Sequence, residues 1–345
     1  MRIVIDLQGA QSASRFRGIG RYSLALALGV ARNAGEHEVW LVLNNALPDA
    51  IAPIRQAFEG LVPQERIRLF DIATPAAEAN PGSRWRTRAD ERMREYVIGQ
   101  LKPDAVLVTS LFEGFVDDAV VSVGAFRGGA DTAVVLYDLI PFLNPRAYLG
   151  SPAQQQYYDR KIASLRSAGL LLAISDYSRQ EAIDALGLDP DRVVAISTAV
   201  DPARFHPAEQ SAEQLALLHA RFGITRKVIM YAPGGFDTRK NIDGLITAHG
   251  LLPPALRATH QLLIASKLEA DQTRRLREHG ARIGRAADEL LFTDYVDDDT
   301  LVALYRSAAL FVFPSKHEGF GLPALEAMAC GALVIGGDNT SLPEV

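Results

Sequence analysis

The sequence predicts an α/β protein made of two Rossmann-like domains, each built on a parallel sheet. Short apolar runs alternate with helical patterns along the chain, which is typical of parallel α/β domains. Two series of such runs are separated by the polar, proline-containing segment 201–207, and 345 residues are enough for two domains. We therefore expect domains at 1–200 and 201–345, with their sheets facing across a ligand cleft at the carboxyl ends of the strands.

The candidate strands are short runs rich in branched or aromatic residues and bounded by turn residues. In the first domain they are 3–7, 38–43, 66–69, 105–108, 133–136, 170–174 and 193–196. In the second they are 228–231, 261–265, 290–292, 310–313 and 333–335. Only a loop follows the last run, so the second sheet lacks a closing helix. We expect the chain to be a C-terminally truncated piece of a longer protein.

The composition is that of a folded protein, with 48% hydrophobic and 22% charged residues. The net charge of −5 makes nucleic acid an unfavourable partner. Cys330 is the single cysteine, which excludes an intramolecular disulfide and favours a cytoplasmic location. No stretch approaches the roughly 18 apolar residues of a membrane span. Peripheral contact with a membrane-held substrate, at the inner face of the membrane, remains open.

Two glutamates eight positions apart, Glu318 and Glu326, enclose a glycine-rich turn. The run 310–313 before them is a predicted buried strand, and Pro323 suits the first position of a helix because its missing N–H costs nothing there. The glycines let backbone amides approach a ligand, and the helix N-terminus attracts an anion. Carboxylates on the loop and in the helix can accept hydrogen bonds from hydroxyls on both sides of a diphosphate. This indicates a nucleotide-sugar site; the alternative is a strand–loop–helix unit with two solvated glutamates.

A second candidate segment, 234–241, follows the first strand of the second domain. It places Gly234 and Gly235 at a strand end and the adjacent cations Arg239 and Lys240 at a helix start. Lysine can supply a point charge and arginine a bidentate fork, so the segment suits a diphosphate. The alternative is a solvated loop with helix capping.

Two segments of the N-terminal domain complete the predicted cleft. Gly18 and Gly20 follow the first strand, but the Gly-x-Gly-x-x-Gly spacing and the acidic residue of a dinucleotide site are absent, so NAD is disfavoured. A glycine hinge that brings amides to phosphate or acceptor fits better, with plain turn geometry as the alternative. Asp138, after another buried strand, can orient or deprotonate a hydroxyl, or equally cap the following turn.

Other charged clusters have simpler explanations. The acidic run 297–299 precedes an apolar helical pattern, so helix capping explains it better than a metal, and the histidines form no spaced ligand set. We expect no metal. A cluster of arginines is interleaved with acids, which favours a solvated helix face, although an anionic or membrane-held acceptor can also be met there. The cluster comprises Arg84, Arg86, Arg88, Arg92 and Arg94.

Together these segments resemble the retaining glycosyltransferases of family four, which have the GT-B fold. The segment 314–328 is highly specific to that family. Matching positions run along most of the chain, at 18–22, 138–141, 174–178, 200–205, 239–241, 295–296 and 318–331. The resemblance implies metal-independent transfer of a hexose, with retention of anomeric configuration, to a hydroxyl of a growing surface polysaccharide or glycolipid.

The resemblance also implies roles for residues. It assigns Glu318 to hydroxyls of the transferred sugar, Glu326 to the nucleotide ribose and Lys240 to the diphosphate. The predicted catalytic residues are Glu318, Asp138 and Lys240. The predicted donor-binding residues are Gly18, Gly20, Gly235, Arg239, Lys240, Tyr295, Val296, Glu318, Gly319, Phe320, Gly321, Leu322 and Glu326.

Three positions depart from the family pattern. Tyr137 stands where many members have histidine, Gly235 where many have arginine, and Thr198-Ala199 replaces Asn-Gly in the linker. The first two fit a branch that builds bacterial surface polysaccharides, which makes GDP-mannose the favoured donor and a glycan or lipid-linked glycan the expected acceptor. No cofactor beyond the donor is expected. The alternatives are a non-catalytic or partner-dependent domain of a multi-domain synthase and a sugar-nucleotide epimerase or phosphorylase; a dinucleotide oxidoreductase ranks last.

Overall fold

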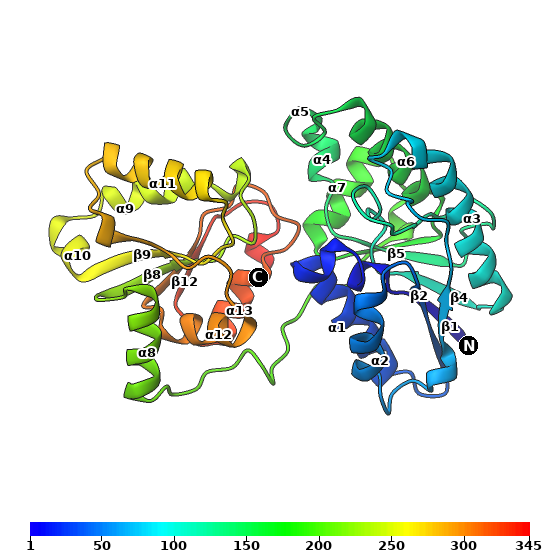
Figure 1. Cartoon of the computed structure of the whole chain (residues 1–345), viewed down its shortest axis with the longest axis horizontal. Helices are drawn as coiled ribbons and strands as arrows, with labels where there is room; N and C mark the ends of the chain where they lie inside the picture. Colours follow the sequence, from blue (N-terminus) through cyan, green and yellow to red (C-terminus); the bar gives the residue numbers. More distant parts are fainter. The chain divides into compact units, whose positions relative to one another are not determined.

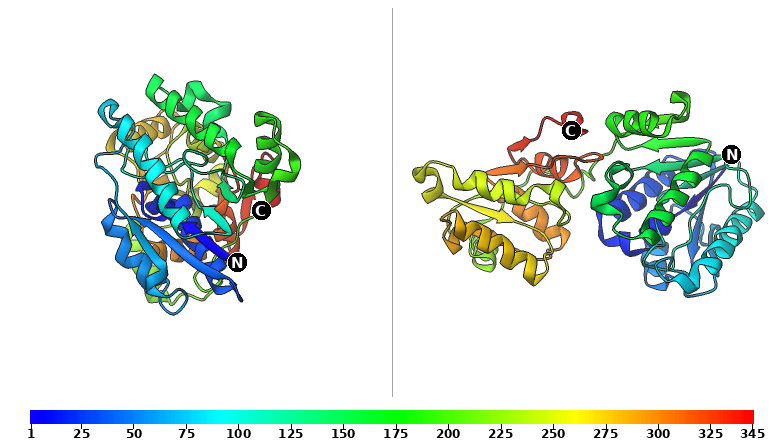
Figure 2. Two further views of the ribbon diagram at one scale, coloured as in Figure 1. Left: turned by 90° about the vertical axis from the view of Figure 1, so that its right-hand side faces the viewer. Right: turned by 90° about the horizontal axis from the view of Figure 1, so that it is seen from above.

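The computed structural model describes all 345 residues, which form two compact units, Met1–Ser197 and Thr198–Val345. The division falls after Ser197, close to the boundary at 200 that the sequence predicts. Each unit is a parallel sheet with helices on both faces (Figures 1 and 2). The predicted architecture of two Rossmann-like domains is confirmed.

The first unit contains a seven-stranded sheet in the order β3-β2-β1-β4-β5-β6-β7. Its central strands are near-continuous apolar runs because helices cover both faces of the sheet. Ile5 pairs with Leu41 on one side and Leu107 on the other, and all three are buried. The strands are β1 (Arg2–Asp6), β2 (Glu38–Asn44), β3 (Ile67–Phe70), β4 (Ala105–Val108), β5 (Thr132–Leu136), β6 (Leu170–Ala173) and β7 (Val193–Ala195).

The helices of the first unit follow the strands in the alternating order of βαβ units. In Figure 1, α1 and α2 lie on one face of the sheet, and α3 and α6 on the other. Ser151 begins α6 by accepting a hydrogen bond from the Gln154 amide at 3.2 Å. The helices are α1 (Gly18–Arg32), α2 (Ile51–Ala57), α3 (Arg84–Gln100), α4 (Ile140–Leu143), α5 (Pro145–Tyr148), α6 (Pro152–Ser167) and α7 (Asp176–Leu186).

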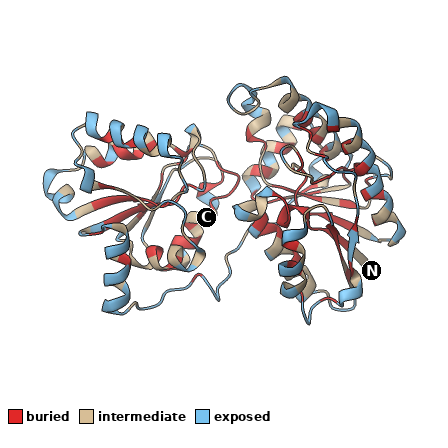
Figure 3. Ribbon diagram, viewed as in Figure 1, coloured by how far each residue is buried: buried red, intermediate tan, exposed pale blue.

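The second unit contains a five-stranded sheet in the order β10-β9-β8-β11-β12. Its core is formed by strand residues such as Met230, Leu263 and Phe311, each fully buried. Most of the two neighbouring strands in the middle of the sheet, β8 and β9, is buried (Figure 3). The strands are β8 (Lys227–Tyr231), β9 (His260–Ile264), β10 (Leu290–Phe292), β11 (Leu310–Phe313) and β12 (Val334–Gly336). The helices are α8 (Ala212–Phe222), α9 (Ile242–Gly250), α10 (Pro254–Thr259), α11 (Ala270–Arg282), α12 (Asp298–Ser307) and α13 (Leu322–Ala329).

Helix starts agree with the predicted capping. Asp297 accepts a hydrogen bond from the Thr300 amide at 2.7 Å, so this part of the acidic run caps α12 as predicted. Pro323 occupies the second position of α13 rather than the predicted first, where its missing N–H is equally harmless. None of the helices is both long enough and apolar enough to cross a membrane.

Candidate functional site

The strand order of the second sheet marks where a ligand is expected. β8 is central, with β9 and β10 on one side and β11 and β12 on the other. The order therefore reverses between β8 and β11, and ligands of such sheets bind at the carboxyl ends of the strands at that point. The segments that leave these two strands are 232–241 and 314–321, which hold both motifs predicted from the sequence.

The two segments are joined by a buried cluster of charges. The Lys240 ammonium donates to Oε1 of Glu318 at 2.7 Å. The Arg239 guanidinium donates to Oε2 of the same carboxylate at 2.5 Å and to the carbonyl oxygen of His317 at 2.8 Å. Lys240 is 7% exposed and Glu318 8%. Two cations therefore meet at one buried carboxylate. Arg239, which is half-buried, also forms an ion pair with Asp237 at 3.2 Å.

Burial and charge act in opposite directions on this carboxylate. Burial raises the pKa of Glu318, but the attraction of Lys240 and then Arg239 outweighs it and holds the pKa below its ordinary value. Burial lowers the pKa of Lys240, and Glu318 opposes that effect. With two cations facing it, Glu318 is ionised at neutral pH.

The backbone around the cluster is fixed by side chains from the strand ends. Tyr231 ends β8, and its hydroxyl donates to the carbonyl oxygen of Lys240 at 2.9 Å and lies 3.1 Å from Oγ of Ser315. Asn241 adopts a left-handed conformation with φ 56° and donates to the carbonyl oxygen of Pro314 at 3.2 Å. The cluster is thus held at the ends of two paired strands, the arrangement that gives a site its precision.

The turn before α13 is shaped from within the protein. Gly321 caps the helix with φ 137°, and a Cβ there would lie 2.8 Å from the Leu342 side chain. The Ser341 hydroxyl donates to the carbonyl oxygens of Glu318 and Phe320, at 2.8 and 2.7 Å. Packing by the C-terminal segment therefore already requires the glycine that the sequence suggested for ligand approach.

The predicted ribose residue, Glu326, lies in a separate environment from Glu318. It is on α13, 4% exposed, and accepts a hydrogen bond from the Tyr305 hydroxyl at 3.0 Å. Tyr305 itself is fully buried in α12. The two glutamates therefore differ in partners: Glu318 is held by cations and Glu326 by a phenol.

The remaining predicted donor residues are spread along the same sheet edge. Gly319 and Phe320 are buried, whereas Leu322 and Val296 are half-buried. Tyr295 follows β10 and is 64% exposed. Gly235, after β8, has φ 158° with open space where a side chain would stand.

The glycines after β1 begin a helix, and their predicted contact with phosphate or acceptor stays a prediction. Gly18 and Gly20 lie in the first turn of α1, and neither has a positive φ. A Cβ on Gly20 would stand 2.4 Å from the Arg15 backbone, so this glycine allows the preceding segment to pack on the helix. Close chain packing and ligand approach require the same residue, so the packing of Gly20 does not decide between them.

Asp138 caps the turn that follows β5. Its Oδ1 accepts a hydrogen bond from the Ile140 amide at 3.0 Å, which is one of the two alternatives that the sequence left open. Its neighbour Tyr137 donates to the carbonyl oxygens of Thr109 and Ile19, at 3.0 and 3.3 Å, and burial raises the pKa of its phenol well above the ordinary value. Tyr137 therefore ties the β5 end to the start of α1; a catalytic use of Asp138 stays a prediction.

A buried carboxyl group at the reversal point of the first sheet was missed by sequence reasoning. Glu113 follows β4 and accepts hydrogen bonds from the hydroxyls of Ser12 and Ser110, both at 2.7 Å, and of Ser14 at 3.0 Å. Burial raises the pKa of Glu113. A single acid in a loop has no spacing pattern, so no signal in the sequence could have found it.

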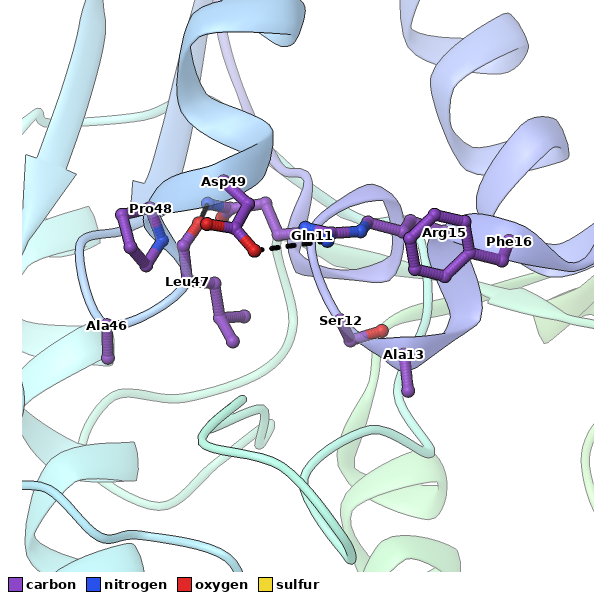
Figure 4. Close-up of a pocket in the computed structure, with 9 residues that line it drawn as sticks. All are labelled: Gln11, Ser12, Ala13, Arg15, Phe16, Ala46, Leu47, Pro48 and Asp49. Atoms are coloured by element: carbon purple, nitrogen blue, oxygen red, sulfur yellow. Dashed lines mark hydrogen bonds and ion pairs between the residues drawn. The ribbon is translucent and has the colours of Figure 1, made fainter.

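A pocket of about 210 Å³ lies at the carboxyl ends of β1 and β2 (Figure 4). Arg15 and Asp49 point toward each other there, with Nη2 and Oδ2 3.3 Å apart. Phe16 is 72% exposed, and the Arg15 guanidinium lies 4.6 Å from its ring centre. The buried Gln11 amide fixes one wall by donating to the carbonyl oxygens of Asn44 and Leu47. An exposed ring beside paired polar groups suits a hydroxylated ligand.

These features agree with comparisons to known proteins. Residues 218–345 match the family model described as Glycosyl transferases group 1. The chain belongs to this family through its C-terminal domain. The matched range includes the whole of the Arg239, Lys240 and Glu318 cluster.

Two similar curated proteins are mannosyltransferases of Escherichia coli. The serotype-specific mannosyltransferase WbdA is 39% identical over 346 residues, which is 100% of this chain and 41% of that protein. The O-antigen chain mannosyltransferase B is 39% identical over 184 residues, or 53% of this chain and 46% of that protein. The chain thus spans less than half the length of these relatives.

Solved structures of low sequence identity share the fold. Anabaena HepE, crystallised in complex with UDP and glucose, superposes with a TM-score of 0.65 at 17% identity, covering 100% of this chain and 82% of that one. WaaG, a glycosyltransferase involved in lipopolysaccharide biosynthesis, gives 0.62 at 16% identity and covers 98% and 82%. The fold is therefore GT-B, as the resemblance implied.

Proposed function

We propose that this group 1 glycosyltransferase moves mannose from GDP-mannose to a hydroxyl of a growing surface polysaccharide or glycolipid, with retention of configuration. The observation that carries the proposal is the Arg239, Lys240 and Glu318 cluster at the strand-order reversal between β8 and β11. Its two cations complement a diphosphate, and the carboxylates of Glu318 and Asp237 hold them in place. The names of the two mannosyltransferase relatives support the choice of sugar.

In the proposed reaction, the bond between the anomeric carbon and the phosphate oxygen breaks as the acceptor hydroxyl forms a new bond on the same face of the sugar. The hydroxyl proton passes to the departing diphosphate. Negative charge develops on that diphosphate, and cations already held at the site stabilise it without reorganising. Lys240 and Arg239 would carry this role, and Glu318 would hold them while accepting a hydrogen bond from a sugar hydroxyl.

We further propose that the base of the nucleotide stacks on Tyr295. This ring is exposed at the same sheet edge, after β10. A large aromatic ring in water loses no stabilising contact when a base stacks on it, and the stacking buries apolar surface. Stacking on an aromatic ring contributes about 1–3 kcal/mol per base.

A calorimetric panel of GDP, UDP, ADP and pyrophosphate tests the donor assignment. We expect GDP to bind most tightly. We expect Tyr295→Ala to lower the affinity for GDP about tenfold, because the stacking contribution is lost, and to leave pyrophosphate binding unchanged.

One result of this panel would contradict the donor assignment, and another would contradict stacking of the base on Tyr295. Tighter binding of UDP or ADP than of GDP would show that the donor does not carry guanine. An equal loss of pyrophosphate and GDP affinity in Tyr295→Ala would place Tyr295 at the phosphates instead. Binding of GDP without transfer from GDP-mannose would favour a non-catalytic or partner-dependent domain.

For the acceptor, we propose that a sugar unit of the glycan occupies the pocket of Figure 4. Its volume of about 210 Å³ corresponds to roughly seven waters at ~30 Å³ each, which suits one sugar unit rather than a long chain. Asp49 and Arg15 can hydrogen-bond hydroxyls, and Phe16 can cover an apolar ring face. The transfer is proposed to occur in the cytoplasm, at the membrane face that holds a lipid-linked acceptor.

Asp49→Ala is expected to raise KM for a mannose-oligosaccharide acceptor about tenfold, since a hydrogen bond to a charged group contributes about 1.5–3 kcal/mol. The donor KM should stay unchanged. Initial-rate kinetics with each substrate varied in turn make the measurement, with the exposed Glu59→Ala beyond the end of α2 as control. An unchanged acceptor KM in Asp49→Ala would remove this pocket from the acceptor site.

A further inference from the structure

The acidic and basic residues of α3 lie on different faces of the helix, which the sequence does not reveal. Its acids and arginines alternate along the chain, and that pattern favoured a solvated face. In the structure every carboxylate of the helix is buried: Asp90, Glu91 and Glu95 are 7%, 2% and 3% exposed. The predicted solvated face is wrong for Arg94, which is 1% exposed and forms an ion pair with Asp6 inside the domain.

Glu91 and Glu95 are hydrogen-bonded to partners beneath the helix. Glu91 accepts a hydrogen bond from the Arg160 guanidinium of α6 at 2.8 Å. Glu95 accepts from the Ser122 hydroxyl and the Phe126 amide, both at 2.6 Å. These contacts hold the acids on the inner face, so they do not neutralise the outer face of α3.

The outer face of α3 carries no carboxylate; besides Ala89 and Gln100, its exposed residues are arginines and large side chains. Arg88 and Arg92 are exposed on successive turns, and neither forms an ion pair. Trp85, Met93 and Tyr96 accompany them at 67%, 49% and 44% exposure.

Phe126 extends this surface from the loop that Glu95 anchors. It is 60% exposed and packs edge-on against Tyr96 at 5.8 Å between ring centres. We call this set of residues the α3 face; it comprises Trp85, Arg88, Arg92, Met93, Tyr96 and Phe126.

We infer that the α3 face binds the surface of an anionic lipid bilayer. Tryptophan and tyrosine favour the headgroup region, where their rings have both apolar and polar surroundings. A helix with arginines and apolar rings on one side lies in the interface plane, attracted by acidic headgroups. A chain of net charge −5 would be repelled by such a surface unless its cations were gathered in this way.

The chemistry of the face favours lipid over an acidic protein partner. An acidic peptide needs arginines whose forks are fixed by neighbours for paired recognition. Here Arg88 and Arg92 are exposed and form no ion pair, and Arg92 donates one hydrogen bond to the carbonyl oxygen of Arg88, at 3.0 Å. They lie between rings suited to insertion among headgroups. The inference goes beyond the transfer reaction and rests on no step of it.

Co-sedimentation with vesicles tests the inference. We expect the protein to bind vesicles of phosphatidylcholine mixed with phosphatidylglycerol, to bind pure phosphatidylcholine weakly, and to be released by salt. The double variant Arg88→Gln/Arg92→Gln should bind the acidic vesicles about 25-fold more weakly, from about fivefold for each basic residue. Trp85→Ala should weaken binding to the acidic vesicles without changing its salt dependence.

The control is Arg32→Gln/Arg282→Gln, which removes the same charge from exposed sites at the ends of α1 and α11. Equal weakening in the control, or wild-type binding by the α3 double variant, would overturn the inference. Failure of the wild-type protein to sediment with acidic vesicles would also overturn the inference. Circular dichroism and GDP calorimetry on the same samples separate these outcomes from misfolding and from failure of the donor assignment.

Discussion

Lys240→Ala is expected to lower kcat/KM for mannosyl transfer by about 100- to 1000-fold, the cost of removing one preorganised donor at developing negative charge. Lys240 is 7% exposed, and its ammonium lies 2.7 Å from Oε1 of Glu318. The ammonium is therefore already desolvated and held in one position before the donor binds. GDP affinity should fall at least about tenfold, as expected for a lost charge-assisted hydrogen bond. Calorimetry gives the affinity, and nucleotide release gives the rate.

Lys227→Ala is the matched control. Lys227 begins β8, the strand that leads to Lys240, but it is exposed at the amino end, away from the carboxyl ends where ligands bind. The control should leave GDP affinity and transfer unchanged. GDP affinity in Lys240→Ala equal to that of the wild type would exclude Lys240 from the diphosphate site.

The fold was accessible to sequence reasoning because buried parallel strands leave a strong local signal. A strand covered on both faces must be apolar at nearly every position, as in the run 310–313 that became β11. The ends were less accurate: β1 begins at Arg2, not at residue 3, because pairing with β2 rather than apolarity sets the limit.

The charge cluster was only half predictable. Sequence motifs indicated Lys240 and Glu318 separately, each as a ligand contact. Their direct ion pair joins positions 78 apart in the chain and depends on β8 lying beside β11, which no local pattern specifies. The burial of Glu113 and of the α3 carboxylates could not be predicted for the same reason. In each case the burial depends on segments distant in the sequence that pack against these residues.

The ion pair changes the interpretation of Glu318. As a sugar contact alone, the carboxylate would be expected to point toward open space. Instead, both of its oxygens are held by Arg239 and Lys240. We therefore expect Glu318 to position the two cations as well as to meet the sugar, so that its loss affects transfer more than nucleotide binding.

Glu318→Gln separates these two effects. The amide keeps the shape but removes the negative charge beside two cations, so GDP should bind at least as tightly as to wild type. Transfer should nevertheless fall by about 100-fold, the lower limit for a lost electrostatic contact at the reacting group. This is the reverse of Lys240→Ala, in which nucleotide affinity falls. Loss of GDP binding in a folded Glu318→Gln protein would contradict this separation, because it would show that nucleotide affinity itself depends on the carboxylate charge.

The same substitution has a pH signature. The pKa of Glu318 in the folded protein lies below its ordinary value, so between these values the unfolded chain binds more protons. The carboxylate therefore stabilises the fold above its ordinary pKa near 4.5, and this stabilisation is lost as the pH falls through the folded value. Glu318→Gln should lower the free energy of unfolding at pH 7 by about 3 kcal/mol, because the buried Lys240 ammonium loses its counterion. Urea unfolding at a series of pH values should show the wild type losing this advantage below pH 4.5, whereas parallel curves would mean that the ion pair contributes nothing to folding.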